Sequence, residues 1–196
     1  MAGTICSSAA QYTAQLGALV GKLKTSAIDH FAGVLYEAWR DNRRVYVFGN
    51  GGSALTASHH ACDLLKTASV DGQKRLCVFA LNDNVGITTA VGNDLSYEEV
   101  FRFPLSTYAC RGDVAVAISA SGNSANVLRA CEWARANGVT VVALTGFEGG
   151  KLAELADIHI NIPSENYGLI EDLHLSVGHV VAQMLRSRIM TSSVSA

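Results

Sequence analysis

The sequence predicts an α/β fold in which a five-stranded parallel sheet is covered on both faces by helices. Short apolar runs rich in β-branched residues alternate with longer helix-compatible segments, which is the pattern of successive β–α units. Such runs are typical of strands buried on both faces. Two of the runs end in loops of glycine and small polar residues, so we expect a ligand beyond that edge of the sheet.

The chain of 196 residues is long enough for one domain with a substantial core. We expect a single domain over residues 1–196, with helices in 1–42, an α/β core in 43–190 and a frayed tail in 191–196. Spacings of three and four predict two leading helices, whose apolar series are Leu16, Val20 and Leu23, then Ile28, Phe31, Leu35 and Trp39. One sheet cannot cover both helices completely, so we expect their remaining apolar faces to be used in oligomerisation.

The core elements follow in order along the chain. Strands are predicted at 45–48, 76–81, 114–118, 140–144 and 157–162. Helical segments are predicted at 54–67, after Asn84 to about 109, from about 125 to 137, briefly after 150, and from about 169 to 188. Gly138 suits the end of the third of these segments, and Pro163 ends the last strand.

Composition limits the kinds of partner. The chain is 49% hydrophobic with a net charge of −2 and has no basic run, which argues against a nucleic-acid ligand. No apolar run reaches membrane-spanning length, and we expect neither a signal peptide nor a membrane partner. The 5 cysteines are scattered without CxxC spacing, mostly in apolar runs, so we expect buried free thiols and a cytoplasmic location.

The two glycine-serine loops are suited to an anion. Residues 49–53 read GNGGS and residues 119–124 read SASGNS, each between a strand and a helix. Backbone N–H groups at such a junction converge on one point. Neither loop has a lysine or arginine, which favours a phosphate monoester over a triphosphate. Two ordinary turns could share this composition, and GNGGSA with Asp83 distantly resembles a dinucleotide fingerprint, but its spacing is not GxGxxG and the second loop has no role in that scheme.

A second group of residues could move protons or bind a metal. His59 and Asp63 are four residues apart and share a helix face. Glu171 and His179 lie two turns apart on the last predicted helix, about 80° around its axis, so both can face one cavity. Imidazoles and carboxylates suit proton transfer near neutral pH and equally the binding of a divalent transition metal. His174 lies further round the helix from His179 and is expected to be structural or to support a site residue from behind.

Taken in order, these motifs resemble those of sugar isomerase (SIS) domain proteins, and most closely those of phosphoheptose isomerases. The matching segments are GNGGS at 49–53, His59 and Asp63, VGND at 91–94, SASGNSANV at 119–127, ALTG at 143–146, and Glu171 with His179. Phosphoheptose isomerases interconvert sedoheptulose 7-phosphate and a heptose 7-phosphate. The resemblance covers nearly the whole chain.

The resemblance implies a three-layer sandwich with a flavodoxin-like sheet, extra N-terminal helices and a cytoplasmic homotetramer with active sites at subunit boundaries. It implies aldose–ketose isomerisation of sedoheptulose 7-phosphate to D-glycero-D-heptose 7-phosphate through an enediol, with Asp63, Glu171 and His179 as catalytic residues. The implied metal is zinc, with His59, Asp63, Glu171 and His179 as ligands. The implied substrate-binding residues are Asn50, Gly51, Gly52, Ser53, Asn93, Asp94, Ser119, Ala120, Ser121, Ser124 and Glu171.

Three positions depart from the family pattern. Asp63 stands where the family usually has glutamate, Glu171 where it has glutamine, and Ala120 where threonine is common. The site is then one unit more negative, which favours a bound cation. The base could be either carboxylate. The substrate could be another long-chain ketose phosphate, such as an octulose 8-phosphate. A non-catalytic SIS module that binds a phosphosugar or a protein is a further alternative, against which His59 and His179 argue.

Overall fold

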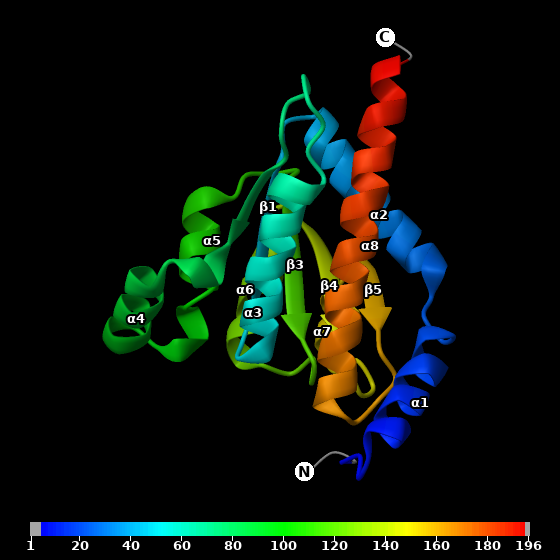
Figure 1. The fold of residues 1–196 in the computed structure, drawn as a ribbon. Coiled ribbons are helices and arrows are strands. Elements are labelled where there is room, and N and C mark those ends of the chain that lie inside the picture. The colour runs from blue at the N-terminus through cyan, green and yellow to red at the C-terminus, as the bar shows by residue number, and fades with distance from the viewer. Residues whose placement is uncertain (1–4, 195–196) are drawn as a thin grey trace.

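The computed structural model describes residues 5–194, and its centre is a five-stranded, all-parallel sheet (Figure 1). The strand order is β2-β1-β3-β4-β5. This is the 2-1-3-4-5 order of flavodoxin-like sheets, so the predicted fold class is confirmed. The strands are β1 (Arg44–Gly49), β2 (Cys77–Ala80), β3 (Val114–Ser119), β4 (Thr140–Thr145) and β5 (Ile158–Asn161).

Helices and short turns connect the strands. The α-helices are α1 (Ala9–Val20), α2 (Thr25–Arg40), α3 (Gly52–Cys62), α4 (Val85–Asp94), α5 (Arg102–Tyr108), α6 (Ala125–Ala136), α7 (Leu152–Leu155) and α8 (Tyr167–Val194). A π-helical turn, η1 (Asp63–Thr67), continues α3, and two 3₁₀ turns are η2 (Leu81–Asp83) and η3 (Tyr97–Glu99). The predicted helix at 54–67 is therefore two elements, α3 and η1.

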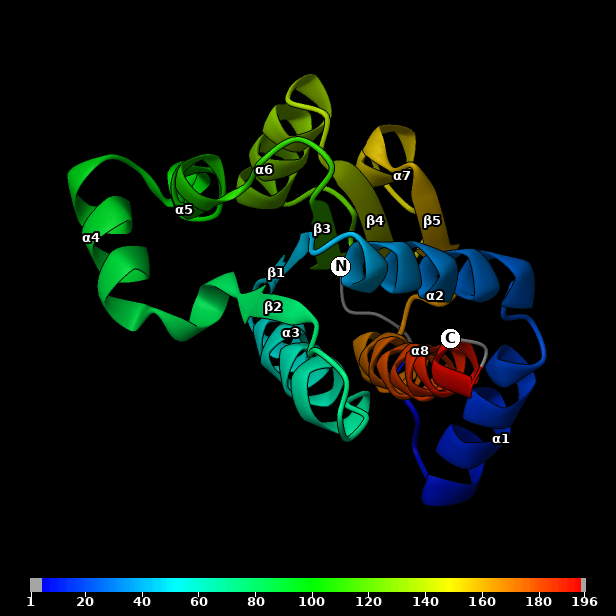
Figure 2. The same cartoon turned by 90° about the horizontal axis from the view of Figure 1, so that it is seen from above.

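The alternation of side chains along β1 divides the core into two layers. Val45 and Val47 point to a cluster shared with α2, α3 and α8. Tyr46 and Phe48 point to the opposite cluster, shared with α4, α5, α6 and α7. Figure 2 shows these two groups of helices on opposite sides of the sheet, with α4 extending away from it. The molecule is thus the three-layer arrangement that the sequence predicts.

The loops after β1 and β3 start side by side. β1 and β3 are neighbours in the sheet, and Gly49 pairs with Ile118 at their ends. The chain continues outward from β1 to β2 on one side and from β3 to β4 on the other. The two strands therefore flank the point where the strand order reverses, which is where open α/β sheets bind their ligands.

Some details of the ends and surfaces differ from the prediction. Helix α8 continues past 188 to Val194, because the stretch from 189 to 194 has no glycine or proline and Ile189 is buried; 195–196 lie outside the described residues. In α1 the buried residue is Leu19, whereas Val20 is exposed. All five cysteines are free as predicted, but only Cys131 is buried. Among the described helices, none has the length and apolarity needed to cross a bilayer.

Candidate active site

The two glycine-serine loops enclose a small cavity at the carboxyl edge of the sheet. Its volume is about 160 Å³. It is lined by Asn50, Ser53, Ser119, Ala120, Ser121, Ser124, Tyr167 and Glu171. The first loop leads into α3 and the second into α6, so the N-termini of two helices are directed toward this region. The arrangement offers hydroxyls and helix N–H groups to an anion, without a cationic side chain.

Glu171 reaches this cavity from the start of the second turn of α8. Its carboxylate lies against the Cα of Gly52, where a β-carbon on residue 52 would collide with both carboxylate oxygens. Gly52 is the first residue of α3, so the carboxylate stands at the positive end of that helix. The carboxylate is therefore next to the phosphate cradle rather than in a separate site.

A pair of amides joins the two loops. The Asn50 Nδ2 donates to Asn126 Oδ1 at 2.8 Å, and the Asn126 Nδ2 donates to Asn50 Oδ1 at 2.9 Å. The hydroxyl of Tyr97 also donates to Asn50 Oδ1, at 3.1 Å. Sequence reasoning did not select Asn126 or Tyr97 as site residues. In the sequence, the signal for Asn126 is only a polar residue two positions after the second loop; in the structure it is 3% exposed in the first turn of α6.

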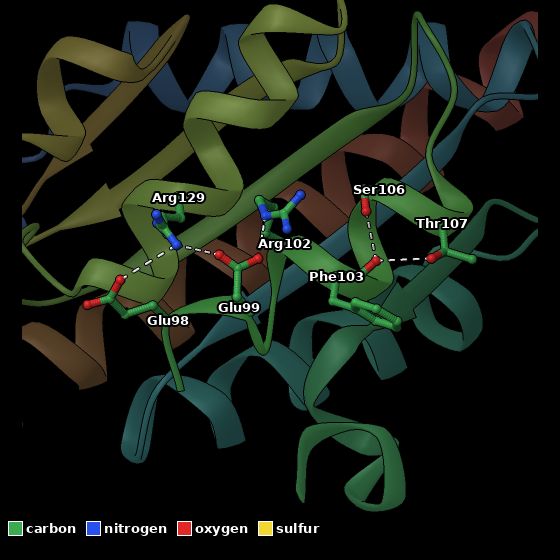
Figure 3. A network of polar contacts seen from close by, with 7 residues as sticks. All are labelled: Glu98, Glu99, Arg102, Phe103, Ser106, Thr107 and Arg129. Atoms are coloured by element: carbon green, nitrogen blue, oxygen red, sulfur yellow. Dashed lines mark hydrogen bonds and ion pairs between the residues drawn. The ribbon is translucent and has the colours of Figure 1, made fainter. Parts of the chain in front are cut away.

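An ion-pair network fixes the segment that carries Tyr97. Glu99, which is nearly buried, pairs with Arg102 in α5 and with Arg129 in α6, and Arg129 also lies 3.7 Å from Glu98 (Figure 3). The network joins η3 and α5 to α6. It thereby holds Tyr97 in reach of the first loop.

A second cluster lies between α3, η1 and α8. The Nε2 atoms of His59 and His179 are 3.0 Å apart. Asp63 Oδ2 lies 3.4 Å from His59 Nε2 and 3.5 Å from His179 Nε2. The structure thus brings together residues from two helices that are far apart in the sequence. Figure 1 shows α3 and α8 side by side in front of the sheet.

The three donors fit a divalent transition metal. Their ligand atoms all lie within 4.8 Å of one another. A tetrahedral ion with bonds of about 2.0–2.1 Å has ligand–ligand edges of roughly 3.3 Å, close to the three separations in this cluster. Two imidazoles and one carboxylate, with a position left for another ligand, are typical of catalytic zinc.

The remaining predicted residues lie further away. Glu171 is not in the three-residue cluster, because His179 comes eight positions later, which corresponds to about 12 Å along α8. Asn93 and Asp94 lie exposed in the last turn of α4, where the Asn93 Nδ2 donates to Asp94 Oδ1 at 2.7 Å, and neither lines the cavity. The structure therefore places the predicted residues in a cradle, a His–Asp cluster and a surface turn.

Two further histidines are structural. His60 donates from Nε2 to the carbonyl of His174 at 2.9 Å, and His174 donates from Nε2 to the carbonyl of Thr145 at 3.0 Å. The Nδ1 atom of each ring is buried without a partner, which suits the neutral tautomer. Burial lowers the pKa of His60 and the pKa of His174 to about 4. The structural role expected of His174 agrees with this geometry.

We expect the metal-free protein to lose stability as pH falls from about 6.5 toward 4, because the unfolded chain binds protons at these rings before the folded chain does. At pH 5 the free energy of unfolding should be lower by about 2 kcal/mol per ring than at pH 7. Urea unfolding at both pH values, in the presence of a chelator, measures the difference. His174→Gln should reduce this pH dependence, whereas the control His30→Gln, at an exposed ring, should retain it. Equal pH dependence in the unmodified protein and both variants would contradict the assignment.

Comparison with known proteins agrees with this geometry. The family model for the SIS domain matches residues 11–146. The phosphoheptose isomerase of Rhodospirillum rubrum is 42% identical over 159 residues, which cover 81% of this chain and 84% of the relative. That of Mycobacterium bovis (strain BCG / Pasteur 1173P2) is 45% identical over 149 residues, or 76% of each chain. A solved phosphoheptose isomerase from Neisseria gonorrhoeae superposes with a TM-score of 0.84 at 29% identity, covering 91% of this chain and 96% of that one. The chain therefore belongs to the SIS domain family, and its similar relatives there are phosphoheptose isomerases.

Proposed function

We propose that this protein is a phosphoheptose isomerase, converting sedoheptulose 7-phosphate to D-glycero-D-heptose 7-phosphate through an enediol. The observation that carries the proposal is that the same two helices, α3 and α8, contribute to both the cradle and the His–Asp cluster. Helix α3 begins at the first loop and carries His59, while α8 carries Glu171 at the cradle and His179 at the cluster. One substrate can then be held by its phosphate while its carbonyl end reaches groups that move protons.

The phosphate is assigned to the two loops. Ser53, Ser119, Ser121 and Ser124 line the same cavity and supply hydroxyl donors. The N-termini of α3 and α6 add backbone N–H groups and favourable dipoles. Such neutral donors bind a monophosphate without Mg²⁺, and they leave the open-chain sugar directed along α3. Asn93 and Asp94 are proposed to contact the sugar in the assembled oligomer.

Asp63 is proposed to transfer the proton between C1 and C2. Its side chain is 15% exposed, so most of the carboxylate is shielded from water. His179 is assigned to the sugar oxygens, which gain and lose protons as the carbonyl moves. Glu171 is the alternative base, since its carboxylate stands at the cradle.

A divalent cation, zinc in the first instance, is proposed at His59, Asp63 and His179, whereas Glu171, the further ligand that the resemblance implies, lies at the cradle. When bound, such a cation polarises a carbonyl oxygen and stabilises negative charge that develops on it. The two imidazoles and the Asp63 carboxylate of this chain hold it, and His179 remains beside the sugar oxygens.

The proposed assembly is a cytoplasmic homotetramer without nucleic-acid or membrane partners. An apolar groove of about 1060 Å³ runs beside the edge strand β2, between α3 and the α4–α5 segment. Phe79, Leu65 and Val85 are 48%, 46% and 68% exposed there. A groove of this size on a single chain favours coverage by another subunit.

The function is tested by incubating the purified protein with sedoheptulose 7-phosphate and following the formation of an aldose phosphate by NMR. The alternative of a longer substrate is motivated by Glu171, which stands at the cavity wall where the family usually has an amide. A substrate panel that includes an octulose 8-phosphate tests this alternative. We expect turnover of the seven-carbon substrate to be the fastest. Binding of the phosphosugar without turnover would instead identify a non-catalytic module, and faster turnover of a longer ketose would change the substrate.

A further inference from the structure

Thr67 contacts the carboxylate of Asp63 at the oxygen that is not paired with His59 and His179. Its Oγ1 donates to Asp63 Oδ1 at 2.9 Å. The other oxygen, Oδ2, is the one that lies 3.4 Å from His59 and 3.5 Å from His179. The two oxygens of one carboxylate are therefore divided between a hydroxyl donor and the candidate ligands.

The backbone places Thr67 for this contact. Asp63 and Thr67 are the first and last residues of η1, and the N–H of Ala68 donates to the carbonyl of Asp63 at 2.9 Å across the wide turn. Single π turns of this kind inside helices occur frequently at functional sites. Threonine is also restricted at χ1, so its hydroxyl has few alternative directions.

Helix α8 fixes the end of the same turn. Arg186 Nη1 donates to the carbonyl of Thr67 at 3.3 Å and also to the carbonyl of Ser69. Arg186 is seven residues after His179, so it lies on nearly the same face of α8. The helix that supplies one candidate ligand thus also anchors the turn that orients another.

We propose that Thr67 is a positioning residue for the cation site: its hydroxyl binds Asp63 Oδ1 and so presents Oδ2 to a cation held with His59 and His179. Arg186 supports this by fixing the turn to α8. The proposal rests on the proposed cation site. Hydrogen bonds to a ligating carboxylate typically set its orientation, and their loss costs 10- to 100-fold in metal affinity.

The test titrates Co²⁺ into the metal-free protein and reads the visible absorption of the bound ion. Thr67→Val keeps the shape and removes the hydroxyl, and we expect a 10- to 100-fold weaker affinity. Thr67→Ser restores a hydroxyl and should recover most of the affinity. Thr13→Val removes a hydroxyl from α1 and should bind as the unmodified protein does. Urea unfolding of the metal-free variants checks that each is folded.

Each outcome bears on a different statement. Equal Co²⁺ affinity of the unmodified protein and a folded Thr67→Val variant would overturn the role of Thr67 and leave the isomerase proposal intact. Failure of the unmodified protein to bind Co²⁺ would overturn the cation site together with the role of Thr67, while the NMR assay still decides the reaction. If Thr67→Val does not fold, Arg186→Gln replaces it, with a smaller but measurable loss of affinity expected and an unchanged affinity counting against the proposal.

Discussion

Replacing Gly122 with alanine is expected to abolish phosphosugar binding and to lower the free energy of unfolding by about 3–5 kcal/mol. Gly122 has a φ of +62°, and a β-carbon there would lie 2.6 Å from the carbonyl carbon of Gly149, with its oxygen closer still. Both obstacles are backbone, so no side chain can move aside. The second loop would have to open, which separates the hydroxyls of Ser119 and Ser124. Calorimetric titration with sedoheptulose 7-phosphate and urea unfolding measure the two effects.

Gly72→Ala is the matched control for this prediction. Gly72 has a φ of +77°, but no atom lies within 4 Å of where its β-carbon would be. The control therefore has the cost of the left-handed backbone, about 1–2 kcal/mol, without the collision. Binding should be unchanged in Gly72→Ala. Comparable stability and affinity in the two variants would show that the contact with Gly149 does not hold the second loop.

Asp63→Asn is expected to lower kcat by a factor of about 10² to 10⁴ while KM changes little. The amide has nearly the shape of the carboxylate, and its Oδ1 can still accept the Thr67 hydroxyl, so the turn should persist. What is lost is the capacity to take up a proton and the negative charge that would help to hold the proposed cation. The phosphate is held elsewhere, by loops that Asp63 does not touch, so binding should survive. Steady-state kinetics and exchange of substrate hydrogen in D₂O measure turnover and proton transfer separately.

Glu171→Gln decides which carboxylate is the base. If Asp63 has that role, Glu171→Gln retains exchange and turnover within about tenfold, and it restores the amide that the family usually has there. Loss of exchange in Glu171→Gln with retention in Asp63→Asn would reverse the assignment. Full turnover in both variants would remove both carboxylates from the proton-transfer step.

The sequence predicts the layers, the five strands and the positions of both loops, because each depends on local features. Apolar runs mark the buried strands, and the glycines and serines mark the ends of β1 and β3. Which strands are neighbours can be predicted only from the resemblance. The pairing of Gly49 with Ile118 confirms that β1 and β3 are adjacent. The apolar run at 45–48 predicts burial of both faces, but it does not indicate which helices cover Val45 and Val47 and which cover Tyr46 and Phe48.

Side-chain separations could not be predicted in the same way. The angular spacing of Glu171 and His179 places them on one face, but the rise along α8 puts them in different parts of the site. The π turn at Asp63 has no sequence signal, since Leu64, Leu65 and Lys66 are equally suited to an α-helix. The prediction that most cysteines are buried is wrong, because Cys62 and Cys77, for example, line the groove beside β2, which a single chain does not cover.

Helix α3 also sets the distance between the first loop and the His–Asp cluster. His59 comes seven positions after Gly52 at the first loop, which corresponds to about 10 Å of helix. Each carbon added to an extended sugar lengthens it by roughly 1.3 Å, given C–C bonds of about 1.5 Å. If the phosphate binds at the first loop and the carbonyl end at His59, as proposed, this fixed span would exclude ketoses too short to reach both ends, whatever the configuration of the hydroxyls between.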